Sequence, residues 1–281
     1  MMNYVRTPAI VLLLVCLGVS GCATTGDSAP SSANDNMDAV VWQQTSAEYA
    51  AVTTGIYASA TTALEAIAKT DRARSMAVVL DVDETVLDNV PYQAQLVLDD
   101  ATYEGESWDR WVALRAAPAT PGVVDFIQAS QSLGVHVVFI TNRRCRARPD
   151  STGDCPQKDD TLANLQDVGI DTTSTTLFLR GEIPPEGCAE LLTAAEQDDG
   201  TWSSDKTSRR ECVRLDHDIV MLFGDQFGDF KEVEGGWSGR DLAAEFSEYW
   251  GKTWFMLPNP TYGGWKPRTS DEKRALIRGV D

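Results

Sequence analysis

Short apolar runs that alternate with helix-like segments constrain the fold of this 281-residue chain more than any other feature. Apolar runs occupy residues 76–80, 135–140, 175–179, 219–223 and 253–257. Such runs are typical of strands buried on both faces of a parallel sheet. Helical patterns occupy residues 38–68 (one long or two short helices), 118–133, 159–168, 206–215 and 241–250. This alternation predicts an α/β fold with a doubly wound, mainly parallel sheet.

The N-terminal segment has the features of an export signal rather than of the fold. Residues 9–19 form an apolar run that is too short to span a bilayer but typical of a signal-peptide core. The string Val19-Ser20-Gly21-Cys22 resembles a bacterial lipobox. We therefore expect a signal peptide over 1–21, acylation of Cys22 and a flexible tether over 22–37. The alternative is an ordinary secretory signal in which Cys22 is there by chance.

The charge balance limits the partners of the chain. Asp and Glu number 42 against 24 Lys and Arg, which gives a net charge of −18. Binding to a nucleic-acid polymer is not expected, because phosphate contacts need clustered Lys and Arg. A small anionic substrate would need a metal ion or a few well-placed cations. The sequence leaves open whether the chain is a monomer or a homodimer.

Four cysteines follow Cys22, and an exported chain meets an oxidising compartment. Cys145, Cys155, Cys188 and Cys212 allow three pairings, among which sequence alone cannot choose. We favour Cys145–Cys155 and Cys188–Cys212, since each pair brackets a polar, loop-like stretch. The chain has no CxxC spacing, so a zinc site of the usual Cys/His kind is not expected. His136 and His217, its only histidines, lie beside strands and are interpreted as structural.

Chemically useful side chains follow the predicted strands, where active sites of doubly wound sheets lie. Asp81 and Asp83 follow the first strand, and Asp225 and Asp229 follow the fourth. Carboxylates this close repel each other unless they share a proton or a cation, and Mg²⁺ is a natural partner for them. Lys206 opens a predicted helix and would supply further positive charge. The alternative is that these acids and Lys206 lie on a solvated surface.

Four motifs in order resemble those of haloacid dehalogenase-like phosphatases. They are Asp81-Val82-Asp83-Glu84-Thr85, Thr141-Asn142-Arg143, Lys206 and the GDxxxD string at 224–229. The chain is similar in particular to bacterial class C acid phosphatases, which include lipoprotein 5′-nucleotidases. The strings that carry this closer resemblance are 81–89 (DVDETVLDN), 108–112, 121–122, 206–210 and 257–263. The resemblance covers about residues 38–268, and the cysteine-bearing stretches depart from it.

The resemblance implies a role for each matching residue. Asp81 would be the nucleophile, and Asp83 would protonate the leaving oxygen and later deprotonate water. Thr141, with Asn142 beside it, would hold phosphoryl oxygens, and Lys206 would stabilise the transition state. Mg²⁺ would be bound by Asp81, the Asp83 backbone carbonyl and Asp225, with Asp229 ordering its waters. Trp108 and Tyr262 would flank a nucleobase or an aromatic leaving group; the alternative is that both are core residues.

These inferences together predict an exported, lipid-anchored, Mg²⁺-dependent acid phosphatase. Its phosphatase domain spans 38–281, with insertions near 89–117 and 182–205 and a small helical subdomain. The substrates would be nucleoside 5′-monophosphates, hydrolysed through an aspartyl phosphate, and the anchor would hold the enzyme at a bacterial membrane, with the outer membrane favoured. The alternatives are a phosphotransferase with the same residues, and a surface lipoprotein that binds a ligand without turnover.

Overall fold

The computed structural model describes residues 35–280, apart from 71–72, 150, 152, 233–238 and 268. The expected signal peptide, Cys22 and most of the expected tether therefore lie outside the described residues. Within the described ranges, every helix is too short or too polar to cross a membrane.

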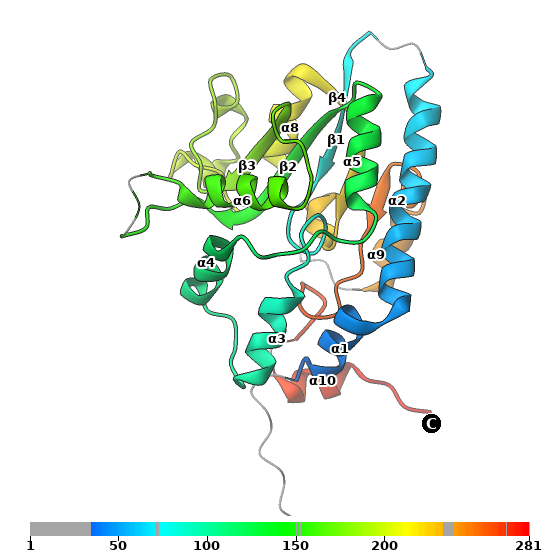
Figure 1. The fold of residues 1–281 in the computed structure, drawn as a ribbon, viewed down its shortest axis with the longest axis vertical. Coiled ribbons are helices and arrows are strands. Elements are labelled where there is room, and N and C mark those ends of the chain that lie inside the picture. Colours follow the sequence, from blue (N-terminus) through cyan, green and yellow to red (C-terminus); the bar gives the residue numbers. More distant parts are fainter. Residues whose placement is uncertain are drawn as a thin grey trace, which may run out of the picture. The chain divides into compact units, whose positions relative to one another are not determined.

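A five-stranded parallel sheet forms the core (Figure 1). Its strands are β1 (Ser75–Leu80), β2 (His136–Arg144), β3 (Thr175–Arg180), β4 (His217–Gly224) and β5 (Trp254–Met256). Their order in the sheet is β3-β2-β1-β4-β5, and all neighbouring pairs are parallel. Along the chain, β2 and β3 are added on one side of β1, and β4 and β5 are then added on its other side. This confirms the predicted α/β fold and places the switch point between β1 and β4.

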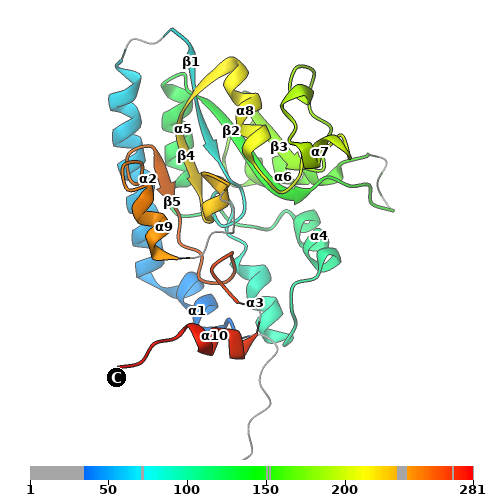
Figure 2. The same ribbon diagram turned by 180° about the vertical axis from the view of Figure 1, so that it is seen from behind.

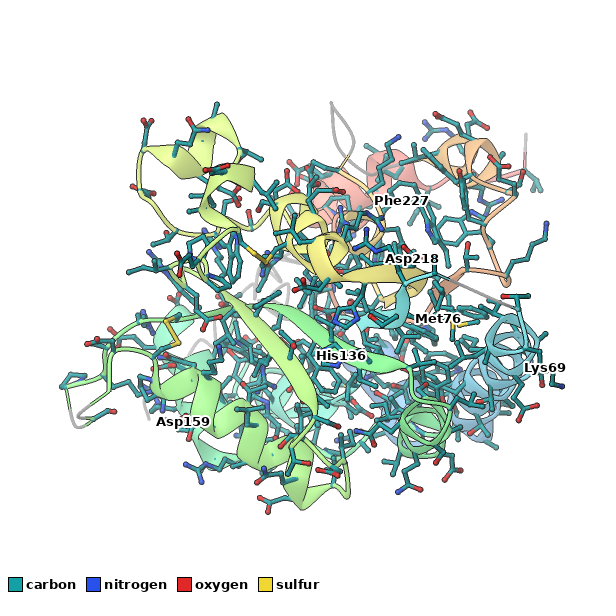
Figure 3. All side chains as sticks on the ribbon, turned by 90° about the horizontal axis from the view of Figure 1, so that it is seen from above. Lys69, Met76, His136, Asp159, Asp218 and Phe227 are labelled. Carbon is teal, nitrogen blue, oxygen red and sulfur yellow. A yellow bond between two sulfur atoms is a disulfide. The ribbon has the colours of Figure 1, made fainter. Side chains whose placement is uncertain are left out.

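Helices cover both faces of the sheet because side chains alternate along each strand. Val78 and Leu80 of β1 face a core shared with α2 (Ala47–Ala68), α5 (Val123–Ser132) and α6 (Pro156–Asp167). Ala77 and Val79 face the opposite side, where α8 (Thr207–Asp216) packs. Figure 3 shows the strands from above, with helices on both sides of them.

Shorter elements surround this three-layer core. Helices α3 (Val90–Leu98) and α4 (Gly105–Leu114) occupy the predicted insertion near 89–117 and lie beyond the carboxyl ends of the strands (Figure 1). In the reverse view, α1 (Met37–Thr45) and α10 (Ser270–Leu276) lie beside α3 (Figure 2). The remaining short helices are η1 (Ala189–Leu191), α7 (Ala194–Gln197), η2 (Phe227–Asp229) and α9 (Arg240–Glu245).

Several predicted boundaries were wrong. The helix expected from residue 118 begins only at Val123, because Pro118 and Pro121 disfavour helical backbone in the residues before them. The helix expected over 241–250 ends at Glu245. Strand β2 continues to Arg144, so the Thr141-Asn142-Arg143 motif lies on the strand rather than after it.

In the described part of the chain, the two disulfides are the pairs predicted from the sequence, Cys145–Cys155 and Cys188–Cys212. Cys155 is the N-cap of α6, so the first bridge ties the end of β2 to the start of that helix. Cys212 lies on α8, so the second bridge ties the 182–205 segment to the helix that begins after Lys206.

His136 and His217 stack on each other at the amino-terminal end of the sheet. Their ring centroids are 4.6 Å apart and their planes differ by 8°. His136 Nε2 shares a hydrogen bond with Thr176 Oγ1 (2.9 Å), and His217 Nδ1 shares one with Ser75 Oγ (2.8 Å). Burial, and then the neighbouring His217, lower the pKa of His136 below its ordinary value. Each side chain therefore links its strand to a neighbouring strand, which fits the structural role predicted for both histidines.

This lowered pKa predicts a loss of stability in acid. The imidazole of His136 takes up a proton more readily in the unfolded chain than in the fold, so its contribution is complete above the unfolded value of about 6.5 and is lost as pH falls below it. In His136→Gln, the difference in unfolding free energy between pH 7.5 and pH 5 should shrink, by less than about 1 kcal/mol because the ring is partly exposed. Urea unfolding of the wild type and the variant at both pH values measures this difference. A difference that is the same in the two proteins would contradict the lowered pKa of His136.

Candidate active site

A buried lysine between two aspartates forms the centre of the site. Lys206, the N-cap of α8, is 5% exposed. Its Nζ donates to Asp81 Oδ1 and, at 2.6 Å, to Asp229 Oδ1. Asp81 directly follows β1 and Asp225 directly follows β4, so the two acids meet because these strands are parallel neighbours.

The three carboxylates outnumber the one ammonium group. Oxygen atoms of Asp81, Asp225 and Asp229 all lie within 4.8 Å of one another, and all three residues are buried. Burial raises the pKa of Asp81 to about 7, although Lys206 opposes the shift. Burial, followed by the charges of the other two carboxylates, raises the pKa of Asp225 well above its ordinary value. An all-oxygen donor set with excess negative charge suits a hard divalent cation such as Mg²⁺.

Gly224 makes this close packing of acids feasible. A Cβ atom at this position would lie 2.2 Å from Asp229 Cβ and 2.3 Å from its Oδ2, well inside contact distance. Asp229 Oδ2 is held there by the backbone N–H of Gln226, at 2.9 Å. The last residue of β4 therefore has to lack a side chain for Asp229 to reach Lys206.

Asp83 is held by a second cation, Arg143. The guanidinium donates from Nε (3.0 Å) and Nη2 (2.9 Å) to Asp83 Oδ1, and Arg143 is only 2% exposed. Asn89 Nδ2 donates to the same oxygen at 2.9 Å, and the Thr141 hydroxyl donates to Oδ2 at 3.3 Å. Sequence reasoning did not single out Arg143. The available signal was its spacing of two from Thr141, which puts both side chains on the same face of a strand.

Asn142 and Arg209 join the end of β2 to the segment before α8. The Asn142 side chain accepts a hydrogen bond from Arg209 Nη2 (2.7 Å) and donates one to the Ser204 carbonyl (3.0 Å). Arg209 Nη1 donates to the Thr141 carbonyl at 2.7 Å. The next residue, Arg210, donates to the carbonyl of Asp229 at 3.0 Å. Both arginines are buried, and sequence reasoning assigned neither a role.

Tyr262 is fixed by a buried glutamate. Its hydroxyl is hydrogen-bonded to Glu84, whose other carboxyl oxygen accepts the backbone N–H of Asn89 at 2.9 Å. Glu84 is wholly buried and adopts a left-handed backbone conformation, with φ of 60°. Burial, then the charges of neighbouring carboxylates, raise the pKa of Glu84 well above its ordinary value. The segment that carries Tyr262 is also tied to the acid cluster, because Asn259 Nδ2 donates to Asp225 at 2.8 Å.

These groups open into one cavity of about 860 Å³. Of the predicted site residues, those that line it are Asp81, Asp83, Trp108, Asn142, Lys206, Asp225, Asp229 and Tyr262. Thr141 is wholly buried behind Asp83. Asp35, which accepts a hydrogen bond from Lys273 (2.6 Å), and Asn36, which accepts one from Lys266, also line the cavity.

Comparison with known proteins identifies the family. The family model for the HAD superfamily, subfamily IIIB (acid phosphatase) matches residues 19–265. The chain belongs to this family. The resemblance to haloacid dehalogenase-like acid phosphatases is thereby confirmed, as is the predicted enzyme class, a phosphomonoester hydrolase, at the level of the family.

Solved structures and curated relatives agree with this family. The class C acid phosphatase from Bacillus anthracis superimposes with a TM-score of 0.70 at 28% identity, over 89% of this chain and 99% of that one. Acid phosphatase 1 of Solanum lycopersicum is 28% identical over 185 residues, and the stem 28 kDa glycoprotein of Glycine max is 27% identical over 187. These alignments cover 66% of this chain but only 57% and 58% of the two plant proteins.

The close approach at Gly224 gives a test of the site. Gly224→Ala should displace Asp229 from Lys206 and lower kcat for p-nitrophenyl phosphate by about 100-fold or more, the scale seen when one preorganised hydrogen-bond donor is lost. Gly55→Ala is the matched control, because its added Cβ meets nothing within 4 Å on helix α2. The control should keep full activity and gain up to about 1 kcal/mol of stability. Equal activities in the two variants would refute the role given to Asp229.

Proposed function

We propose that this protein is a Mg²⁺-dependent acid phosphatase that hydrolyses nucleoside 5′-monophosphates through an aspartyl phosphate on Asp81. The observation that carries the proposal is the placement of Asp81 in the cavity, beside the Lys206 ammonium and the Asp225 and Asp229 carboxylates. Family membership supports the reaction class. The nucleotide preference, the metal and the covalent intermediate are inferred from the residues that line the cavity.

In the first step, an Asp81 carboxylate oxygen attacks phosphorus, and the bond to the leaving oxygen breaks. Asp83 gives its proton to that oxygen, so the product leaves as a neutral alcohol. In the second step, Asp83 takes a proton from water, whose oxygen attacks the aspartyl phosphate and restores Asp81. Lys206 stabilises the charge that develops on the phosphoryl oxygens, and Arg143 fixes the orientation of Asp83.

The donor set provides for the metal ion. Asp81, Asp225 and the backbone carbonyl of Asp83 would hold Mg²⁺, with Asp229 ordering its waters. When bound, the ion neutralises negative charge on the carboxylates and on the substrate phosphate. Both carboxyl oxygens of Asp229 already accept hydrogen bonds, Oδ1 from Lys206 and Oδ2 from the backbone N–H of Gln226, which suits an orienting role better than direct ligation.

Aromatic side chains at the cavity favour a substrate with a planar ring. Trp108 and Tyr262 line the same cavity as the acids, and both are only partly buried. Stacking of a base on such a ring contributes about 1–3 kcal/mol. The cavity is near the upper end of the range of roughly 300–1,000 Å³ that is usual for ligand sites, which leaves room for a nucleoside.

The proposed location is outside the cytoplasm, with Cys22 acylated and the phosphatase domain tethered to a bacterial membrane, with the outer membrane favoured. Two disulfides in the described part of the chain support export, because such bonds persist in oxidising compartments. The lipobox-like string before Cys22 supports the anchor.

Substitution of the two catalytic acids tests the chemistry. Asp81→Asn should lower kcat by several orders of magnitude for every phosphomonoester, because the attacking charge is gone. Asp83→Asn should lower kcat much more for AMP than for p-nitrophenyl phosphate, whose leaving group needs less protonation. Steady-state assays of released phosphate measure both, with mass spectrometry to exclude deamidation. Equal losses for the two substrates in Asp83→Asn, with chemistry rate-limiting, would argue against the role of Asp83 as the acid.

The same assays distinguish the alternative activity. Transfer of phosphate to an added alcohol, in place of its release, would indicate a phosphotransferase.

Metal binding should be visible without turnover. Saturating Mg²⁺ at about 100 times its Kd stabilises a folded protein by about 2.7 kcal/mol, or roughly 5–10 °C in Tm at this size. We expect a rise of this order in the EDTA-treated wild type. Asp225→Asn should melt at a higher temperature than the metal-free wild type, because one buried negative charge is removed, and should not respond to Mg²⁺. A wild type that is indifferent to Mg²⁺ would contradict the metal assignment.

A further inference from the structure

Helix α4 carries Trp108 to the mouth of the cavity. The Trp108 ring packs edge-on against Tyr92 of α3, with centroids 5.1 Å apart. Its centroid also lies 5.9 Å from Cζ of Arg143, the cation that holds Asp83. Because α4 lies beyond the ends of the strands (Figure 1), the sheet alone does not fix the position of this ring.

The residue after Trp108 anchors α4 on another side. Successive helical side chains point about 100° apart, so Asp109 leaves the helix in a different direction. Its carboxylate accepts hydrogen bonds from Arg148 Nε (2.8 Å) and Nη2 (2.9 Å), and from Gln157 Nε2 (2.9 Å). The Arg148 contact is a two-pronged, charge-assisted pair, the strongest common type of side-chain hydrogen bond.

Arg148 also reaches the main body of the fold. Its Nη1 donates to Asp160 of α6, and Asp160 accepts a further ion pair from Arg115, the C-cap of α4, at 2.8 Å. Arg115 therefore connects α4 to α6 directly, and Arg148 bridges the two helices because it pairs with both Asp109 and Asp160. Hydrogen bonding to Asp109 raises the pKa of Arg148, which keeps it charged at every working pH.

The Cys145–Cys155 disulfide restrains the segment from which Arg148 extends. The Cys145 backbone N–H donates to the Arg180 carbonyl of β3 at 2.8 Å, and Cys155 caps α6. Both ends of this disulfide loop are thus attached to the core. Such a closure restricts the conformations open to the intervening residues, so less conformational entropy is lost when Arg148 binds Asp109.

We propose that Arg148 is a positioning residue for substrate recognition: through Asp109 it holds α4, and with it Trp108, at the cavity, while the disulfide loop holds Arg148. Arg148 does not line the cavity. Its loss therefore affects the binding of ring-bearing substrates rather than the chemical steps. The expected change in KM rests on the proposed nucleotide substrate, whereas the role of Arg148 in holding α4 rests on the contacts alone.

The kinetic test compares two substrates and two variants. In Arg148→Met, KM for AMP should rise about tenfold, while kcat and KM for glycerol 3-phosphate, which has no ring, stay within about twofold. Lys158→Met is the matched control, because it removes one cation and one ion pair (to Glu182, 2.7 Å) from α6 without a contact to α4. Arg148→Lys should recover only part of the affinity, since it lacks the two-pronged geometry. Equal rises in KM for both substrates, or none, would overturn the proposal.

Hydrogen–deuterium exchange tests the position of α4 without turnover. Arg148→Met and the double variant Cys145→Ser/Cys155→Ser should both speed exchange at the amides of 105–114, with α2 and α5 unchanged. Asp109→Asn should do the same, which covers the case in which Arg148→Met folds poorly. Unchanged exchange in α4 would overturn the proposal. If the wild type fails to hydrolyse AMP, the substrate assignment is wrong, and the exchange result still decides whether Arg148 positions α4.

Discussion

The structure depends on one buried ammonium group, Lys206, held between Asp81 and Asp229. Burying charges is costly unless each is paired, so the carboxylates cannot gather at the ends of β1 and β4 without it. Helix α8, which begins after Lys206, contributes two further buried cations that are also paired. One turn further along α8, Arg209 binds the end of β2 and Arg210 binds the carbonyl of Asp229. A single helix start thereby assembles the ends of three strands into one site.

This arrangement reconciles an acidic chain with an anionic substrate. The net charge of −18 is spread over the whole molecule, whereas the cations that matter are few and buried. A charge in a low-dielectric surrounding acts more strongly over a few ångströms than one in water. Lys206 and the proposed Mg²⁺, which would offset the excess of carboxylates, would therefore decide what binds in the cavity, whereas the surface charge acts on solubility and on the approach of ions.

The sheet and its acids were predictable because both follow from simple patterns. Apolar runs defined the strands, and a strand end fixes where the next residue lies, so Asp81 and Asp225 were placed correctly beside each other. Arg143, Glu84 and Arg209 were not predicted as site residues. Arg143 shares a strand face with Thr141 only because β2 extends past both residues. The contacts of Glu84 and Arg209 depend on a left-handed residue and on the pitch of α8 against the sheet, which leave no periodic trace in the sequence. The late start of α5 was missed although its prolines were visible.

The presence of Asp35 and Asn36 in the lining of the cavity has a geometric consequence. These residues border the cavity, and Asn36 lies 14 positions after Cys22 in the sequence. An extended chain advances at most about 3.6 Å per residue, so the reach between them is at most about 50 Å. With Cys22 acylated as proposed, the part of the cavity lined by Asn36 would stay within about that distance of the bilayer surface. Hydrolysis would then be confined to a thin layer of solvent next to the membrane, and the alcohol product would be released there.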